Sequence, residues 1–112
     1  MTCSEMLVSA LTPVGLPIYP DVYTGDGLEY LVYNYNEYPD LFGDDTNEMT
    51  QNIVQLHYFL PLAQNPTATK RKIKKAIYSL GETAPTVINA SDGVSQHFVF
   101  EFSIYTAEDA NG

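Results

Sequence analysis

Two histidines, His57 and His97, are the side chains of this sequence with the most adaptable chemistry. Imidazole binds transition metals and transfers protons near neutral pH. Both residues lie in segments where apolar and polar residues alternate, and both are on the less apolar side. Neighbouring strands of one sheet could therefore bring them together as metal ligands or as an acid–base pair. No third ligand is marked by its spacing, and two partly exposed sheet residues without a chemical role are the simpler interpretation.

Cys3 is the only cysteine of the chain, so an internal disulfide and a cysteine-rich metal site are both excluded. It shares one helical face with Leu7 and Leu11, which favours a small buried side chain over a reactive thiol. The sequence also lacks the glycine-rich phosphate loops, paired metal-ligand motifs and nucleophile elbow that mark many enzymes. We therefore expect a protein that is not an enzyme and that needs no cofactor.

Residues 37–48 carry five acids together with a proline and a glycine. Their spacing differs from that of an EF-hand loop, so calcium binding is not indicated. We expect a long solvated loop or hairpin tip that serves as an assembly surface or lines a channel. The acids concerned are Glu37, Asp40, Asp44, Asp45 and Glu48.

The basic residues are the sharpest local feature, because all five fall within six consecutive positions of a chain whose net charge is −9. A charged helix face is usually only solvated, but bases that served solubility alone would be scattered. A single cationic face on an anionic body suits contact between identical copies, and such a head-to-tail interface closes into a ring when its rotation permits. The bases are Lys70, Arg71, Lys72, Lys74 and Lys75.

The overall charge also limits the possible partners. A sequence pI near 4.3 argues against non-specific binding of duplex DNA and against docking on anionic lipid. No segment has the length and apolar content of a membrane span, and the first residues lack the pattern of a signal peptide. We expect a protein of a reducing cytoplasm with no membrane partner.

Hydrophobic periodicity places these residues on a small set of elements. Helices are predicted at residues 2–12 and 67–80, and strands at 29–36, 49–60, 84–90 and 96–105. Residues 13–29 form a connection rich in proline and glycine, with a short extended piece at 18–23. The expected fold is α+β, with a mostly antiparallel sheet of about four strands and two helices packed on one face, in the order α-β-β-α-β-β. Residues 1–112 form one domain, and 105–112 are expected to be a flexible tail.

The expected core joins one side of the last strand to the apolar sides of the second strand and the second helix. Seven tyrosines in the first 60 residues exceed what a small core needs, so some are expected at interfaces. The predicted core residues are Phe98, Phe100, Phe102, Ile104, Val54, Leu56, Ile73, Ile77 and Leu80.

This order of elements, with its particular segments, resembles the small neck proteins of long-tailed bacteriophages, the tail terminator or tail-to-head joining (tail completion) family. The resemblance covers nearly the whole chain. It is carried by LPIYPDVY (16–23), YLVYNYNEYP (30–39), IVQLHYF (53–59), Asn65-Pro66 before the basic helix 70–80, and HFVFEFSIY (97–105).

The resemblance implies a structural protein of the virion, assembled in the bacterial host cytoplasm. Family members form hexameric rings that cap the tail tube and join it to the head–tail connector, while DNA passes through the lumen. It also implies that residues 37–48 reach neighbouring subunits or rings, and an acidic lumen would repel DNA phosphates. The chain is shorter than many members, so a tail terminator and an adjacent neck ring both remain open.

Two other functions are compatible with the sequence. A small, strongly acidic domain can imitate DNA and inhibit a DNA-binding enzyme, as anti-restriction proteins do, although the basic helix contributes nothing to such mimicry. A small enzyme could use His57 and His97 with a carboxylate such as Glu101. A hexamer in solution supports the ring, whereas a monomer or dimer supports the mimic.

Overall fold

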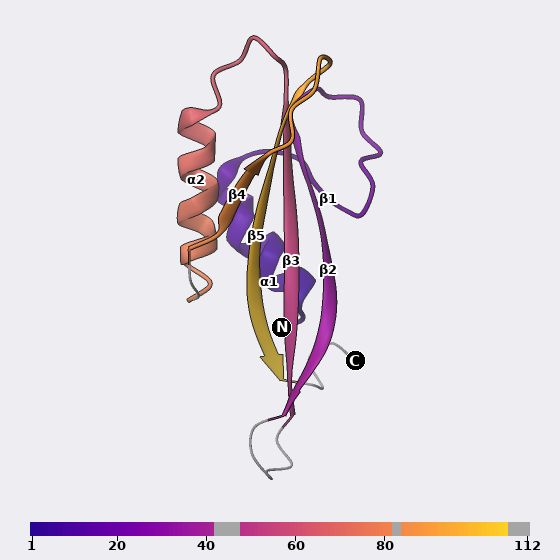
Figure 1. The fold of residues 1–112 in the computed structure, drawn as a ribbon, viewed down its shortest axis with the longest axis vertical. Helices are drawn as coiled ribbons and strands as arrows, with labels where there is room; N and C mark the ends of the chain where they lie inside the picture. The colour runs from indigo at the N-terminus through magenta and orange to yellow at the C-terminus, as the bar shows by residue number, and fades with distance from the viewer. Residues whose placement is uncertain (42–47, 82–83, 108–112) are drawn as a thin grey trace.

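The computed structural model describes residues 1–41, 48–81 and 84–107. The described chain is an α+β fold with a five-stranded sheet and two helices (Figure 1). Its elements are α1 (Cys3–Leu11), the short 3-10 helix η1 (Thr12–Val14), β1 (Ile18–Pro20), β2 (Tyr30–Leu41), β3 (Glu48–Leu60), α2 (Thr67–Tyr78), β4 (Thr86–Asn89) and β5 (Gln96–Ala107).

The strands are arranged in the order β1-β2-β3-β5-β4. β1 runs parallel to β2, and the other neighbours are antiparallel. The prediction of about four antiparallel strands was therefore wrong in detail, and the element order gains a strand before β2. β1 was predicted only as a short extended piece because it has three residues and ends in a proline, which leaves almost no periodicity to detect.

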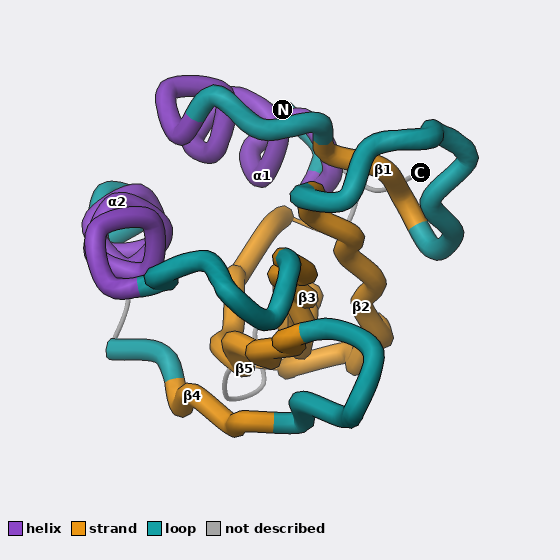
Figure 2. Tube along the Cα trace, turned by 90° about the horizontal axis from the view of Figure 1, so that it is seen from above, coloured by secondary structure: helices purple, strands orange, loops and turns teal. Residues whose placement is uncertain are grey.

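Both helices lie on the same side of the curved sheet, as predicted (Figure 2). Cys3, Leu7 and Leu11 of α1 are fully or almost fully buried, as are Ile73 and Ile77 of α2. They pack against the even-numbered apolar residues of β3 and β5, among which Phe100 is completely buried. The predicted core is confirmed, with Leu80 at its half-buried margin.

Local sequence signals explain where the helices begin and end. Thr2 and Glu5 form a capping box, in which the Glu5 amide donates to Thr2 Oγ1 and the Thr2 amide donates to Glu5 Oε1. At the start of α2, the Thr67 amide donates to Asn65 Oδ1 over 3.0 Å. Gly81 follows α2 with a φ of 85°, a left-handed conformation that glycine adopts without strain.

The long central strands correct the predicted acidic loop. β2 continues to Leu41 and pairs with β3 from Leu41↔Glu48 onward, so Glu37, Asp40 and Glu48 belong to strands. Asp44 and Asp45 lie outside the described residues. β5 likewise runs to Ala107, so the predicted tail begins at least three residues too early. Pro39 and the acids favour loops when only their local sequence is considered. These residues belong to strands because β2 and β3 pair with one another.

Together β2, β3 and β5 form a three-stranded ribbon that extends away from α2 and gives the described chain extents of 53 × 26 × 24 Å (Figure 1). The two short outer strands cover only part of this ribbon. β1 pairs with β2 only from Leu31 to Tyr33, and β4 pairs with β5 only from Phe98 to Glu101. No described strand therefore borders the ribbon beyond these residues. Pro39 lies along one open edge, where a residue without an N–H discourages pairing with other chains.

Candidate functional site

The cationic face lies on α2 and is defined by the five bases at residues 70–75. Arg71, Lys72, Lys74 and Lys75 are exposed, because Ile73 and Ile77 turn the opposite side of the helix into the core. Lys70 is half-buried, and its Nζ lies 4.2 Å from the centroid of the Phe98 ring. That cation–π contact ties Lys70 to the fold. Four of the five predicted interface bases are therefore exposed to solvent.

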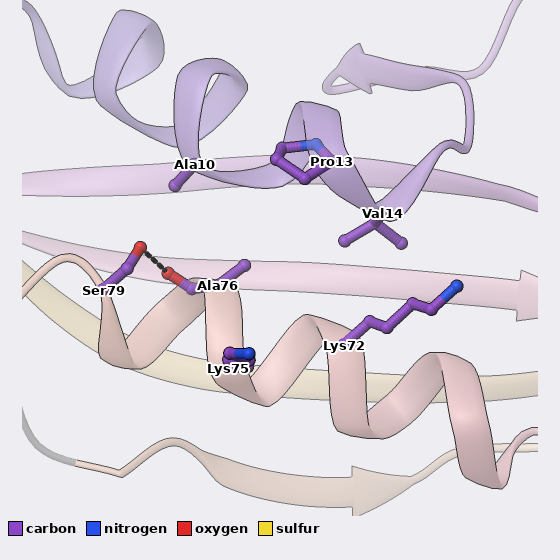
Figure 3. A pocket seen from close by; sticks show the side chains of 7 residues that line it. All are labelled: Ala10, Pro13, Val14, Lys72, Lys75, Ala76 and Ser79. Atoms are coloured by element: carbon purple, nitrogen blue, oxygen red, sulfur yellow. Dashed lines mark hydrogen bonds between the residues drawn. The ribbon is translucent and has the colours of Figure 1, made fainter.

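A shallow groove of about 350 Å³ separates α2 from the end of α1 and from η1 (Figure 3). Ala10, Pro13 and Val14 project toward α2 and form its apolar wall, and Ala76 faces them. The groove thus combines this apolar wall with the side chains of two exposed lysines, Lys72 and Lys75. Its lining residues are Ala10, Pro13, Val14, Lys72, Lys75, Ala76 and Ser79.

Of the predicted acidic assembly residues, the three that the structure describes, Glu37, Asp40 and Glu48, lie at the other end of the described chain. Residues 37–41 of β2 and 48–50 of β3 form the far end of the ribbon, away from α2 (Figure 1). Glu37 is exposed, and its carboxylate adds to burial in raising the pKa of Cys3. The structure does not bring these acids to the cationic face of the same copy, so the two charged regions are separated along the long axis.

Cys3 itself has no properties of a nucleophile. Its side chain is fully buried, and burial together with the charge of Glu37 raises the pKa of the thiol to about 12. A thiolate is the reactive form of cysteine, and it is not accessible at neutral pH. The sequence-based prediction of a small buried side chain is confirmed.

The two histidines do meet on the face of the sheet opposite the helices. His57 of β3 and His97 of β5 are diagonal neighbours, because His57 pairs with Val99 and His97 pairs with Phe59. His57 Nδ1 lies 2.8 Å from His97 Nε2, and His57 Nε2 lies 3.3 Å from the amide of Asn34. Burial lowers the pKa of both imidazoles, and for His57 the charge of His97 adds to this effect.

Aromatic rings continue from this pair across the outer face of the sheet. The His97 ring stacks on Phe59 at 4.1 Å between centroids, Phe59 stacks on Tyr30 at 5.0 Å, and Tyr30 stacks on Tyr23 at 3.7 Å. A depression of about 420 Å³ lies beside this row and the two histidines. The sequence analysis singled out the tyrosines and the histidines as two separate groups of residues. Their approach depends on the register of β2, β3 and β5, which composition does not predict.

No family model matches the sequence, and no curated protein matches it. Within the described parts of the chain, no helix has the length and apolar character needed to cross a bilayer. Among the described residues, no three His, Cys, Asp or Glu side chains converge in a group that could hold a metal.

Proposed function

We propose that this protein is a structural component of a phage neck that acts as a ring of identical copies. In this proposal a hexameric ring caps the tail tube, joins it to the head–tail connector and lets DNA pass through its lumen. The protein is assembled in the bacterial cytoplasm, becomes part of the virion and performs no catalysis. The observation that carries the proposal is the concentration of exposed positive charge on α2, a helix whose own sequence contains no acid.

Electrostatics favour contact between unlike surfaces of two copies over contact between like surfaces. Each copy carries a net charge of −9, so two copies that present like surfaces repel one another. Contact between the cationic face of one copy and an acidic surface of the next replaces that repulsion with attraction and fixes the register. When the two surfaces of one copy bind two different neighbours the contact is heterologous, and repetition of it produces a ring if the rotation closes.

The groove beside α2 supplies the apolar part of such a contact. Charge pairs on exposed surfaces contribute only about 0–1 kcal/mol each, so charge alone would hold a ring weakly. Apolar side chains that enter the groove between Val14 and Ala76 would add burial at the point where Lys72 and Lys75 attract acids. The occupant we propose is the ribbon end of the neighbouring copy, which carries Glu37, Asp40 and Glu48.

The acids that do not meet the cationic face fit the proposed passage of DNA through the lumen. Like charges across a narrow channel repel, so an acidic lumen lets DNA pass without adhering. A DNA mimic would use the same acids to occupy a basic groove of an enzyme, and it would act as a monomer or dimer. The oligomeric state therefore separates these two functions before any partner is known.

Charge reversal at the groove tests the proposed interface. We expect the unaltered protein to be a hexamer by size-exclusion chromatography with light scattering. Lys72→Glu with Lys75→Glu should dissociate it, because both side chains line the groove. The matched control is Arg71→Glu with Lys74→Glu, which changes the net charge equally on exposed positions of α2 outside the groove.

The control pair should weaken the hexamer less than the groove pair. A monomer or dimer for the unaltered protein would overturn the ring and support the DNA mimic. A hexamer that survives reversal of the groove pair would overturn the proposed interface. Circular dichroism should show an unchanged fold for both variants, because none of the four side chains is buried.

A further inference from the structure

From the geometry of the outer sheet face, we propose that His57 and His97 form a two-histidine chelate for a divalent transition metal of the Cu²⁺ type. This site is independent of the proposed ring, because it lies on the sheet face opposite α2 and the groove. The two imidazoles supply two ligands, and water supplies the others.

The separation of the two nitrogens carries the inference. His57 Nδ1 and His97 Nε2 are 2.8 Å apart. Two nitrogens bound at about 2.0 Å and at right angles to one metal would be separated by about 2.8 Å, the arrangement of neighbouring ligands in tetragonal Cu²⁺ or Ni²⁺. In the structure this separation belongs to a hydrogen bond between the rings, so it shows that the two nitrogens lie within reach of one ion and does not select the geometry of that ion. Cu²⁺ is the expected ion, because it binds nitrogen ligands most strongly among the first-row divalent metals.

The surroundings hold the two rings in place. His97 stacks on Phe59 at 4.1 Å, and its backbone amide donates to Ser91 Oγ over 2.9 Å. The far nitrogen of His57, Nε2, faces the side-chain amide of Asn34 at 3.3 Å. A half-turn of that amide presents Oδ1 to Nε2–H, an exchange of nearly identical shape. The His57 proton then resides on Nε2, and Nδ1 is left bare for a metal.

With Nδ1 of His57 bare, His97 Nε2 carries the proton of the imidazole–imidazole hydrogen bond. Binding requires that bond to open and the His97 proton to move through solvent to Nδ1 of the same ring, so that the lone pairs of His57 Nδ1 and His97 Nε2 converge on the ion. The depression beside the pair, of about 420 Å³, has room for an ion and its water ligands. A proton does not compete strongly at neutral pH, because burial lowers the pKa of both rings. The nearby carboxylate of Asp92, which raises the pKa of His97, also favours a bound cation.

The sequence makes the test unusually clean, because the chain has no other histidine. The probe is Cu²⁺ added to the full-length protein at pH 7.5, followed by calorimetry and electron paramagnetic resonance. We expect one ion per chain, with hyperfine coupling from two imidazole nitrogens. His57→Gln and His97→Gln should each weaken binding roughly tenfold or more, because a single imidazole remains.

The double variant His57→Gln with His97→Gln is the control for binding elsewhere, including at the terminal amine. The proposal is overturned if the unaltered protein binds no Cu²⁺ beyond that control, or if its spectrum shows only one imidazole nitrogen. The spectrum of the unaltered protein decides the matter even if a variant fails to fold. Binding of Zn²⁺ more tightly than Cu²⁺ would overturn the assignment to Cu²⁺.

Discussion

At the scale of single residues, the pair His57 and His97 links folding to pH. Burial lowers the pKa of each imidazole below its ordinary value of 6.5, and Asp92 opposes this effect at His97. Near pH 6.5 the two imidazoles therefore bind more protons in the unfolded chain than in the folded chain. Stability must fall as the pH decreases from about 7 toward the lowered pKa values, because the unfolded state binds more protons in that range.

We expect the free energy of unfolding, measured with urea, to decrease between pH 7.5 and pH 5.5. The variant His57→Gln should show a smaller decrease, because one of the two suppressed protonations is gone. Hydrogen bonds lower the pKa values of the carboxylates Glu5 and Asp92. These two groups therefore take up protons below pH 5.5 and do not contribute to the change in stability between pH 7.5 and pH 5.5. A slope that is the same in both proteins would contradict the assignment to the histidines.

At the scale of elements, the far half of the ribbon depends on a buried amide between β3 and β5. Asn52 is fully buried, and its Nδ2 donates to the Ile104 carbonyl over 2.9 Å and to Thr106 Oγ1 over 3.1 Å. We expect Asn52→Ala to lower the free energy of unfolding by about 1–3 kcal/mol, because buried partners of the amide lose a hydrogen bond. Hydrogen exchange should accelerate most at residues 102–107.

The matched control for this prediction is Gln51→Ala, on the neighbouring position of β3. Gln51 is half-buried on the opposite face and donates to Ser103 Oγ over 3.2 Å. Its loss should cost less than about 0.5 kcal/mol, as is usual for a surface substitution. Equal effects of the two substitutions would show that Asn52 has no special part in joining β3 to β5.

The same elements show what local sequence can and cannot predict. The capping box of α1 and the alternation in β3 and β5 depend on neighbours within a few positions, so pattern alone locates them. The extension of β2 through Pro39 depends on its pairing with β3, which no local pattern encodes. The approach of His57 to His97 depends on the register of β3 with β5, for which alternation gives the face but not the partner.

At the scale of the whole molecule, the proposed contact joins two different surfaces, and this has a consequence that contact between two copies of one surface does not share. The variant Lys72→Glu with Lys75→Glu retains the acidic ribbon end. A second variant, Glu37→Gln with Asp40→Asn and Glu48→Gln, retains the cationic groove. Each is expected to be a monomer on its own, because every contact in a head-to-tail ring needs both surfaces.

When these two variants are mixed, one complementary contact per pair is restored. The groove of the second variant meets the ribbon end of the first, while every other pairing lacks one surface. We therefore expect a heterodimer of about twice the 12.5 kDa chain mass, and no larger species, by light scattering. A mixture that stays monomeric would show that the partner acids lie elsewhere on the surface. Recovery of full rings on mixing would contradict a contact made only by these two surfaces, because the chain of contacts must stop after one step.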